Sequence, residues 1–138
     1  MKRTAKAHWA GDLMEGKGTL TTQSGILSET NYSFKTRFEE GVKGTNPEEL
    51  LAAAHAGCFT MAVAAILNQK VLKPTYLDTE AVVTMAGMSI TGVHLSITGA
   101  VVGIQAAEFE AITKDAEKNC LISKVLNIPI TSEAHFII

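Results

Sequence analysis

The feature that most constrains this fold is an apolar stretch from Leu50 to Leu67, which directly follows a strong helix-start signal. Asn46 suits the N-cap, Pro47 suits the first helical position, and Glu49 stands three residues after the cap. The pattern predicts a helix that ends near Asn68, where polar residues return. Apolar or small residues cover nearly all of its circumference, so we expect this helix to be buried on every side.

A chain of 138 residues has little volume in which to bury so long a helix alone. We therefore expect a single domain over residues 1–138 that oligomerises around this helix. The stretch also has roughly the length of a membrane span. Because it is rich in Ala, contains His55 and begins behind a Pro-Glu-Glu cap, a buried core helix is the better interpretation. We predict no membrane interaction.

Segments with the alternating patterns of strands lie on both sides of this helix. A polar stretch over residues 34–46 is interpreted as a loop. The other expected elements are strands over 5–9, 17–22, 26–32, 76–85, 89–102 and 128–138, and helices over 106–118 and 123–126.

Composition and short motifs argue against several classes of function. The net charge is −2 and aromatic residues make up 6% of the chain, so we predict no nucleic-acid partner. The sequence has no nucleotide-binding glycine motif and no paired metal-ligand histidines, so we expect no cofactor and no metal. The basic N-terminus runs into Ala7-His8-Trp9 rather than an apolar signal segment, so we expect a cytoplasmic protein.

The candidates for redox chemistry are Cys58 and Cys120, which lie too far apart in sequence for a C-x-x-C motif. A reducing compartment argues against a static disulfide between them. Cys58 falls near the middle of the predicted helix, where a cysteine can also be a small apolar filler. Cys120 can likewise fill a helix end, or it can resolve a sulfenic acid formed at Cys58.

A reactive Cys58 needs a nearby cation, because it lies about three turns from the helix start and beyond the reach of the helix dipole. Arg37 is the natural candidate, and Glu48 or Glu49 would orient it as a bidentate partner. The alternative is that these are ordinary solvated surface charges. Two other cations precede the helix and are weaker candidates: Lys35 and Lys43.

Spacing along the helix limits how such a site can assemble. Ten residues separate Glu48 from Cys58, which is roughly 15 Å of helical rise. An arginine paired with Glu48 therefore does not easily reach Cys58 of the same straight helix. Two antiparallel helices from two chains would solve this, and a kinked helix is the other possibility. His55, one turn before Cys58, is interpreted either as a base for the thiol or as a packed core histidine.

Five motifs along the chain have a recognisable wording. The principal ones are Gly44-Thr45-Asn46-Pro47-Glu48-Glu49-Leu50 and Ala53-Ala54-His55-Ala56-Gly57-Cys58-Phe59. The other three are Ala7-His8-Trp9-x-Gly11-Asp12, Phe34-x-x-Arg37-Phe38-Glu39 and Cys120-x-x-Ser123-x-x-Leu126. In wording and order they closely resemble the motifs of the osmotically inducible protein C and organic hydroperoxide resistance (OsmC/Ohr) family. The resemblance covers essentially the whole chain and is closer to the osmotically inducible branch.

This resemblance implies an α+β, OsmC-like fold with antiparallel sheets around a long buried central helix. It implies a single OsmC-like domain over residues 1–138 that forms an intertwined homodimer with two sites at the interface. It also implies a thiol-dependent peroxidase that reduces organic hydroperoxides, and more weakly hydrogen peroxide, to alcohols without metal or flavin. The implied reductant is an external dithiol, such as a lipoylated protein.

The resemblance assigns roles to four residues. Cys58 matches the peroxidatic cysteine, which becomes a sulfenic acid, and Cys120 matches the resolving cysteine, which then forms a Cys58–Cys120 disulfide. Arg37 matches the arginine beside the thiolate. Glu48 matches the carboxylate that holds this arginine, which leaves Glu49 to the helix cap.

One departure from the family pattern is visible at Leu121, where the family usually has proline. Its absence leaves Cys120 less constrained and puts the rate of disulfide formation in question. The alternative function is non-catalytic binding of a hydrophobic small molecule, or a stress-related dimeric role, in which the cysteines only pack.

Overall fold

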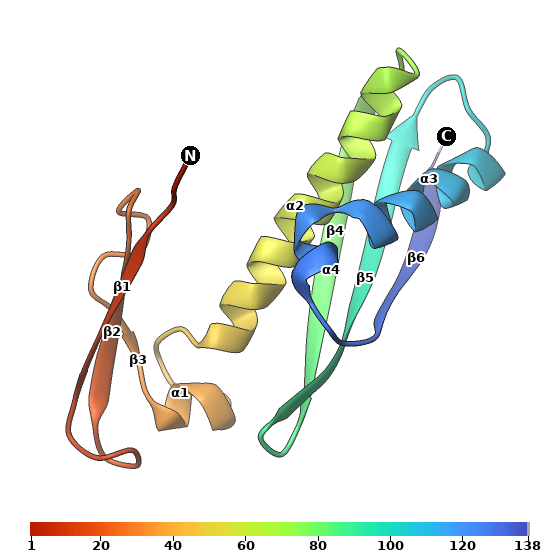
Figure 1. Ribbon diagram of the computed structural model, residues 1–138. Coiled ribbons are helices and arrows are strands. Elements are labelled where there is room, and N and C mark those ends of the chain that lie inside the picture. The colour runs from red at the N-terminus through yellow and green to blue at the C-terminus, as the bar shows by residue number, and fades with distance from the viewer. Residues whose placement is uncertain (138) are drawn as a thin grey trace. The chain divides into compact units, whose positions relative to one another are not determined.

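The computed structural model describes residues 1–137, and the chain divides into two compact units, Met1–Leu50 and Leu51–Ile138 (Figure 1). The first unit contains β1 (Ala5–Ala10), β2 (Lys17–Thr22), β3 (Thr30–Tyr32) and α1 (Phe34–Phe38). The long helix α2 (Pro47–Gln69) begins in the first unit and continues in the second. The second unit also contains β4 (Pro74–Ala86), β5 (Ser89–Val101), α3 (Ala106–Asn119), α4 (Leu121–Val125) and β6 (Ile130–Ile137).

The first unit is an antiparallel sheet with the strand order β1-β2-β3. The rings of Trp9 and Tyr32 meet edge to face over its surface, with centroids 5.6 Å apart. Gly18 lies beneath both rings, and a Cβ there would collide with them. A glycine at this position of β2 therefore lets the two aromatic side chains cover the sheet.

The loop predicted over residues 34–46 is wrong in its first part, where the structure has the short helix α1. Its start is capped reciprocally: Thr36 N–H donates to Ser33 Oγ at 3.2 Å, and Ser33 N–H donates to Thr36 Oγ1 at 2.8 Å. A threonine thus takes the place that glutamate or glutamine usually has in a capping box. The preceding strand is shorter than predicted and occupies only Thr30–Tyr32.

The second unit is a three-stranded sheet with the order β4-β5-β6. β4 and β5 correspond to the strands predicted over 76–85 and 89–102 and form a long antiparallel hairpin, whereas β6 runs parallel to β5. The parallel pair departs from the expectation of antiparallel sheets. It arises because α3 and α4 lie between the two strands and provide the crossover that parallel pairing requires. The α+β class itself is confirmed.

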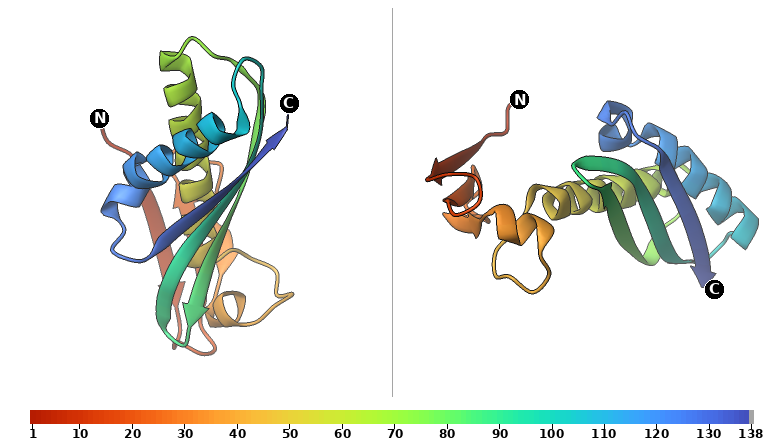
Figure 2. Two further views of the ribbon diagram at one scale, coloured as in Figure 1. Left: turned by 90° about the vertical axis from the view of Figure 1, so that its right-hand side faces the viewer. Right: turned by 90° about the horizontal axis from the view of Figure 1, so that it is seen from below.

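The core of the second unit lies between one face of its sheet and the helices α2 and α3, as the views in Figure 2 show. The helix predicted over 106–118 is confirmed as α3, and Phe109, Ile112 and Ala116 on one of its faces are all buried. The other buried apolar side chains come mainly from α2 and β5: Phe59, Val63, Leu67, Val93, Leu95, Ile97 and Val101. The alternation of buried residues along β5 shows that only one face of the sheet is covered.

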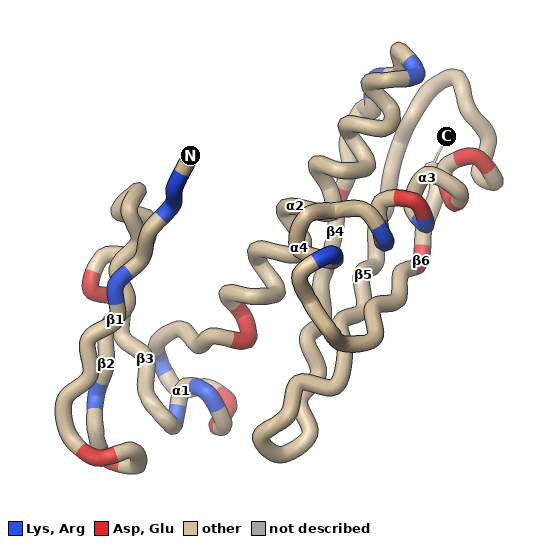
Figure 3. Tube along the Cα trace, in the orientation of Figure 1, with Lys and Arg blue, Asp and Glu red and all other residues tan. Residues whose placement is uncertain are grey.

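Helix α2 carries no charged residue between Glu49 and Lys70, so its trace in Figure 3 is uncoloured over this whole length. Within the single chain, the buried residues of α2 after Glu48 lie in a stripe at every fourth position: His55, Phe59, Val63 and Leu67. The opposite side is exposed, with Met61 at 75%. The expectation of burial on every side is therefore not met by one chain.

By length and hydropathy alone, α2 would also be sufficient to cross a membrane, and 22% of its most apolar window is buried in this chain. Its buried stripe nevertheless packs on a sheet and contains a hydrogen-bonded histidine. These are features of a helix in a protein core, as the sequence predicts.

Candidate functional site

The first unit brings Arg37 and Glu48 together. Arg37 Nε donates to Glu48 Oε1 at 2.6 Å. The Glu48 side chain is almost fully buried, whereas the Arg37 side chain is 41% exposed. The contact uses one guanidinium nitrogen, so it is not the bidentate pair that the residue types suggest.

The local fold that positions this pair depends on the turn between α1 and α2. Asn46 Nδ2 donates to the carbonyl oxygen of Thr36 at 3.2 Å, which ties the start of α2 to α1. Asn46 Oδ1 accepts from Glu49 N–H at 2.7 Å, so the predicted N-cap is confirmed. The Glu49 carboxylate accepts from the Thr45 hydroxyl at 2.8 Å. Glu49 therefore serves the helix start and leaves Glu48 to Arg37.

Arg37 and Glu48 also have unused polar atoms. Within residues 1–137, Glu48 Oε2 is buried without a hydrogen-bond partner. The terminal nitrogens of Arg37 make no hydrogen bond to that part of the chain, and its guanidinium carbon lies 5.5 Å from the ring centroid of Phe38. An anion that approaches Arg37 would therefore find the N–H groups of two free terminal nitrogens on a cation already anchored by a carboxylate.

Both cysteines lie in the second unit and both are free thiols. Cys58 is half-buried on α2, where it packs against the core cluster that contains Cys120. Cys120 is 2% exposed and connects α3 to α4. The unit thus carries one sulfur at the edge of the core and one inside it.

Cys120 is hydrogen-bonded to the buried Ser123, which in turn is hydrogen-bonded to the buried His55. Its Sγ atom lies 3.0 Å from Ser123 Oγ and accepts from the Ser123 backbone N–H at 3.4 Å. Ser123 Oγ lies 2.8 Å from His55 Nε2. The core histidine considered from the sequence is therefore what the structure shows, and its imidazole reaches Cys120 only through the Ser123 hydroxyl.

Burial lowers the pKa of His55 below its ordinary value, so the imidazole is neutral near pH 7. The role of Ser123 was missed by the sequence reasoning. A signal for it exists, because a hydroxyl three residues after Cys120 is placed to meet that side chain across one helical turn. Its contact with His55 depends on the tertiary fold and has no such local signal.

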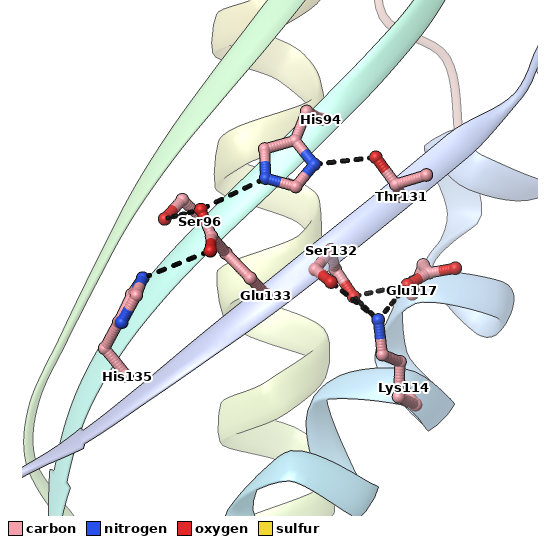
Figure 4. Close-up of polar contacts among 8 residues, drawn as sticks. All are labelled: His94, Ser96, Lys114, Glu117, Thr131, Ser132, Glu133 and His135. Atoms are coloured by element: carbon pink, nitrogen blue, oxygen red, sulfur yellow. Dashed lines mark hydrogen bonds and ion pairs between the residues drawn. The ribbon is translucent and has the colours of Figure 1, made fainter.

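A second polar group lies on the uncovered side of the β5–β6 sheet (Figure 4). His94 contacts Thr131 Oγ1 at 2.6 Å and Glu133 Oε1 at 3.2 Å, and His135 lies 3.6 Å from the other oxygen of Glu133. The hydrogen bond from His94 lowers the pKa of Glu133. Within residues 1–137, no group of three or more histidine, cysteine or acidic side chains is arranged to hold a metal ion.

Comparison with known proteins shows which family this chain resembles. The model of the family described as OsmC-like protein matches residues 39–134. The chain is 47% identical over 133 residues to the Peroxiredoxin OsmC of Escherichia coli (strain K12), a match that covers 94% of this chain and 92% of that protein. It is 35% identical over 95 residues to the Organic hydroperoxide resistance protein OhrA of Bacillus subtilis (strain 168), covering 66% and 67% of the two chains.

The solved structures agree in fold. An OsmC-like protein of unknown function from Vibrio cholerae superposes with a TM-score of 0.72 at 16% identity, over 97% of this chain and 99% of that one. At this identity the similarity supports the fold alone. The fold, the family model and the extent of the match to the E. coli protein lead to one conclusion: this chain belongs to the OsmC-like family.

Proposed function

We propose that this protein is a cysteine-based peroxidase that reduces organic hydroperoxides, and more weakly hydrogen peroxide, to alcohols. Its relatives are named for peroxide reduction and for resistance to organic hydroperoxides, which supports a peroxide-related stress protein. The thiol mechanism goes further than these names. It rests on Cys58, Cys120, Arg37 and Glu48 and needs no cofactor or metal.

The observation that carries this proposal is the ion pair of Arg37 with the buried Glu48 carboxylate. Burying a carboxylate is costly unless a cation holds it, so the pair is a fixed arrangement rather than a chance surface contact. Because Glu48 uses only Nε, the remaining guanidinium N–H groups are available to a thiolate and to the oxygens of a bound peroxide.

The proposed reaction begins with the Cys58 thiolate, which Arg37 stabilises. The thiolate attacks one peroxide oxygen, the O–O bond breaks, and the alkoxide takes up a proton and leaves as the alcohol. Cys58 is then a sulfenic acid. Cys120 attacks this sulfur and forms the disulfide with release of water. An external dithiol, such as one on a lipoylated protein, reduces the disulfide by thiol–disulfide exchange.

The proposal includes a homodimer in which each site is completed by the partner chain. Glu48 and Cys58 lie ten residues apart on one helix, so an arginine held by Glu48 is better placed to serve a thiol of an antiparallel partner helix. The exposed apolar side of α2 is the surface that such a partner would cover. In this proposal the two units act as one OsmC-like domain in an intertwined, cytoplasmic dimer.

The test is peroxide consumption by the purified full chain with cumene hydroperoxide and dithiothreitol. The wild type is expected to turn over, and Cys58→Ser is expected to abolish consumption while retaining the folded dimer. Cys120→Ser serves as the matched thiol control, because it removes the resolving sulfur and retains a first turnover. If Cys58→Ser consumed peroxide as fast as the wild type, the proposal would be wrong. Unchanged binding of a hydrophobic ligand, without turnover by any form, would favour the carrier alternative.

A further inference from the structure

We propose that His55 and Ser123 form a hydrogen-bonded relay that accepts the thiol proton of Cys120 when its sulfur attacks the Cys58 sulfenic acid. The inference rests on the proposed function and assigns two positioning residues to its second step. It concerns Cys120 and not the peroxidatic sulfur.

The geometry is a continuous chain of polar atoms inside the core of the second unit. The distances are 3.0 Å from Cys120 Sγ to Ser123 Oγ and 2.8 Å from Ser123 Oγ to His55 Nε2. All three residues are buried, with exposures of 2%, 8% and 0% for Cys120, Ser123 and His55. A thiol at this depth cannot transfer its proton directly to bulk water, so an internal acceptor is needed for fast attack.

The same positions fit both protonation states of the sulfur, because a serine hydroxyl donates one hydrogen bond and accepts others. In the thiol state, Cys120 S–H donates to Ser123 Oγ, whose hydroxyl donates to His55 Nε2. In the thiolate state both bonds reverse, and the sulfur anion accepts from the hydroxyl and from the Ser123 backbone N–H. A proton can therefore move from sulfur to imidazole without any displacement of heavy atoms.

The protonation state of His55 suits a proton acceptor. Burial lowers its pKa and so favours the neutral imidazole, whose Nδ1-protonated tautomer presents the Nε2 lone pair to Ser123. Its Nδ1 atom is buried without a hydrogen-bond partner within residues 1–137, which is unfavourable for a side chain that merely fills space. An apolar residue would pack on α2 at no such cost. The imidazole is thus better explained by a proton that it receives than by packing.

The location of the relay connects the two sulfurs. His55 lies one helical turn before Cys58 on α2, and its imidazole reaches Ser123 on α4, next to Cys120. Figure 1 shows α4 beside the middle of α2. The relay thus joins the element that carries the sulfenic acid to the element that carries the attacking thiol.

The step is balanced in atoms and electrons. The S–H bond of Cys120 and the S–O bond of the Cys58 sulfenic acid break, and one S–S bond forms. The Cys120 sulfur is oxidised and the Cys58 sulfur is reduced. The Cys120 proton enters the relay as Ser123 passes its own hydroxyl proton to His55. The departing hydroxide takes up one proton and leaves as water, and His55 gives up one proton and returns to its neutral form.

The experiment measures the two steps separately in the full-length protein. Reduced protein receives one equivalent of cumene hydroperoxide and is quenched at times from milliseconds to minutes. Peroxide loss reports the first step, and mass spectrometry after thiol alkylation reports the Cys58–Cys120 disulfide. The variants are Ser123→Ala, Ser123→Thr and His55→Gln. Thr113→Val is the matched control, because it removes a buried hydroxyl that has no hydrogen-bond partner within residues 1–137.

We expect Ser123→Ala and His55→Gln to lower the rate of disulfide formation, relative to peroxide loss in the same protein, by about tenfold or more. Trapping of the sulfenic acid by a cyclic diketone should rise in parallel. Ser123→Thr restores a hydroxyl and should recover most of the rate, and Thr113→Val should match the wild type. Glutamine can hydrogen-bond to Ser123 but cannot take up a proton. A wild-type rate of disulfide formation in His55→Gln would therefore overturn the relay and show that a hydrogen bond to Ser123 is sufficient.

The outcomes also separate this inference from the proposed function. If the wild type consumes no peroxide or forms no Cys58–Cys120 disulfide, the proposed function fails first. If the wild type forms the disulfide and Ser123→Ala forms it equally fast, only the relay is overturned. Should Ser123→Ala not fold, His55→Gln compared with Thr113→Val decides the same question.

Discussion

Arg37 contacts Glu48 through Nε alone, and this single contact determines what a substitution at either position should do. A guanidinium can be anchored at Nε while its terminal nitrogens face a second anion. An ammonium group presents one compact charge, so it cannot hold the same fixed geometry toward both partners. The chemistry proposed for Cys58 therefore depends on arginine and not on positive charge alone.

We predict that Arg37→Lys lowers kcat/KM for cumene hydroperoxide by about a hundredfold, the usual scale for losing one positioned electrostatic donor. Lys35→Met is the control, since it removes an exposed positive charge from the same helix α1. Steady-state peroxide consumption measures both. A lysine variant as active as the wild type would show that charge alone suffices and that the geometry at Glu48 is unimportant.

Residue types and local spacing were sufficient to predict part of the site. The spacing of Asn46 and Glu49 predicts the helix start. It leaves Glu48 and Glu49 as alternatives for Arg37, and only the family resemblance separates their roles. The contact of His55 with Ser123 joins residues 68 positions apart. It exists only because α4 packs on α2, which no periodicity in either segment reveals.

The helical and strand elements themselves were largely predictable, because each has its own pattern of apolar residues. The exceptions have physical causes. α1 has only five residues, too few to show a helical period, and begins at an unusual capping box. The parallel pairing of β6 with β5 is a property of the connection between them and not of either strand's sequence.

Leu121 is the first residue of α4, and the preceding Cys120 has backbone angles of φ −64° and ψ 147°. Proline is favourable at a first helical position, and the extended backbone of Cys120 is the conformation that a following proline requires. The structure thus accommodates the residue that the family pattern usually has, although leucine stands here and its side chain is exposed.

We therefore predict that Leu121→Pro raises the free energy of unfolding by roughly 0.4–1 kcal/mol, because it restricts the unfolded chain without removing a helical hydrogen bond. Lys124→Pro is the control in the same helix. It removes the hydrogen bond from Lys124 N–H to the Cys120 carbonyl oxygen and should destabilise the protein. Urea unfolding followed by circular dichroism compares them, and a destabilising Leu121→Pro would contradict this account of the α3–α4 junction.

At the scale of the whole molecule, the unburied side of α2 is an apolar surface that the single chain leaves uncovered. Met61 is 75% exposed there, and a Cβ at the neighbouring Gly57 would meet no atom within 4 Å. Burial of an uncharged, six-turn helix along one stripe alone leaves apolar area in water that a second copy can cover. The proposed homodimer and the proposed completion of each site by its partner thus depend on one surface.

Because one surface serves both the dimer and the shared site in this proposal, we predict that assembly and activity fail together. Met61→Lys places a charge at the centre of the proposed interface and should raise the dimer dissociation constant at least about thirtyfold, as expected for a residue worth about 2 kcal/mol. Val102→Lys is the control, since Val102 is apolar and 78% exposed but lies in the turn after β5. Sedimentation equilibrium gives the mass of each variant, and peroxide consumption at the same concentrations gives its activity.

If Met61→Lys became a monomer that retained full activity, each chain would hold a complete site by itself. The distance between Glu48 and Cys58 along α2 would then have to be bridged within one chain, and the reason for placing the partner's arginine at the thiol would be lost.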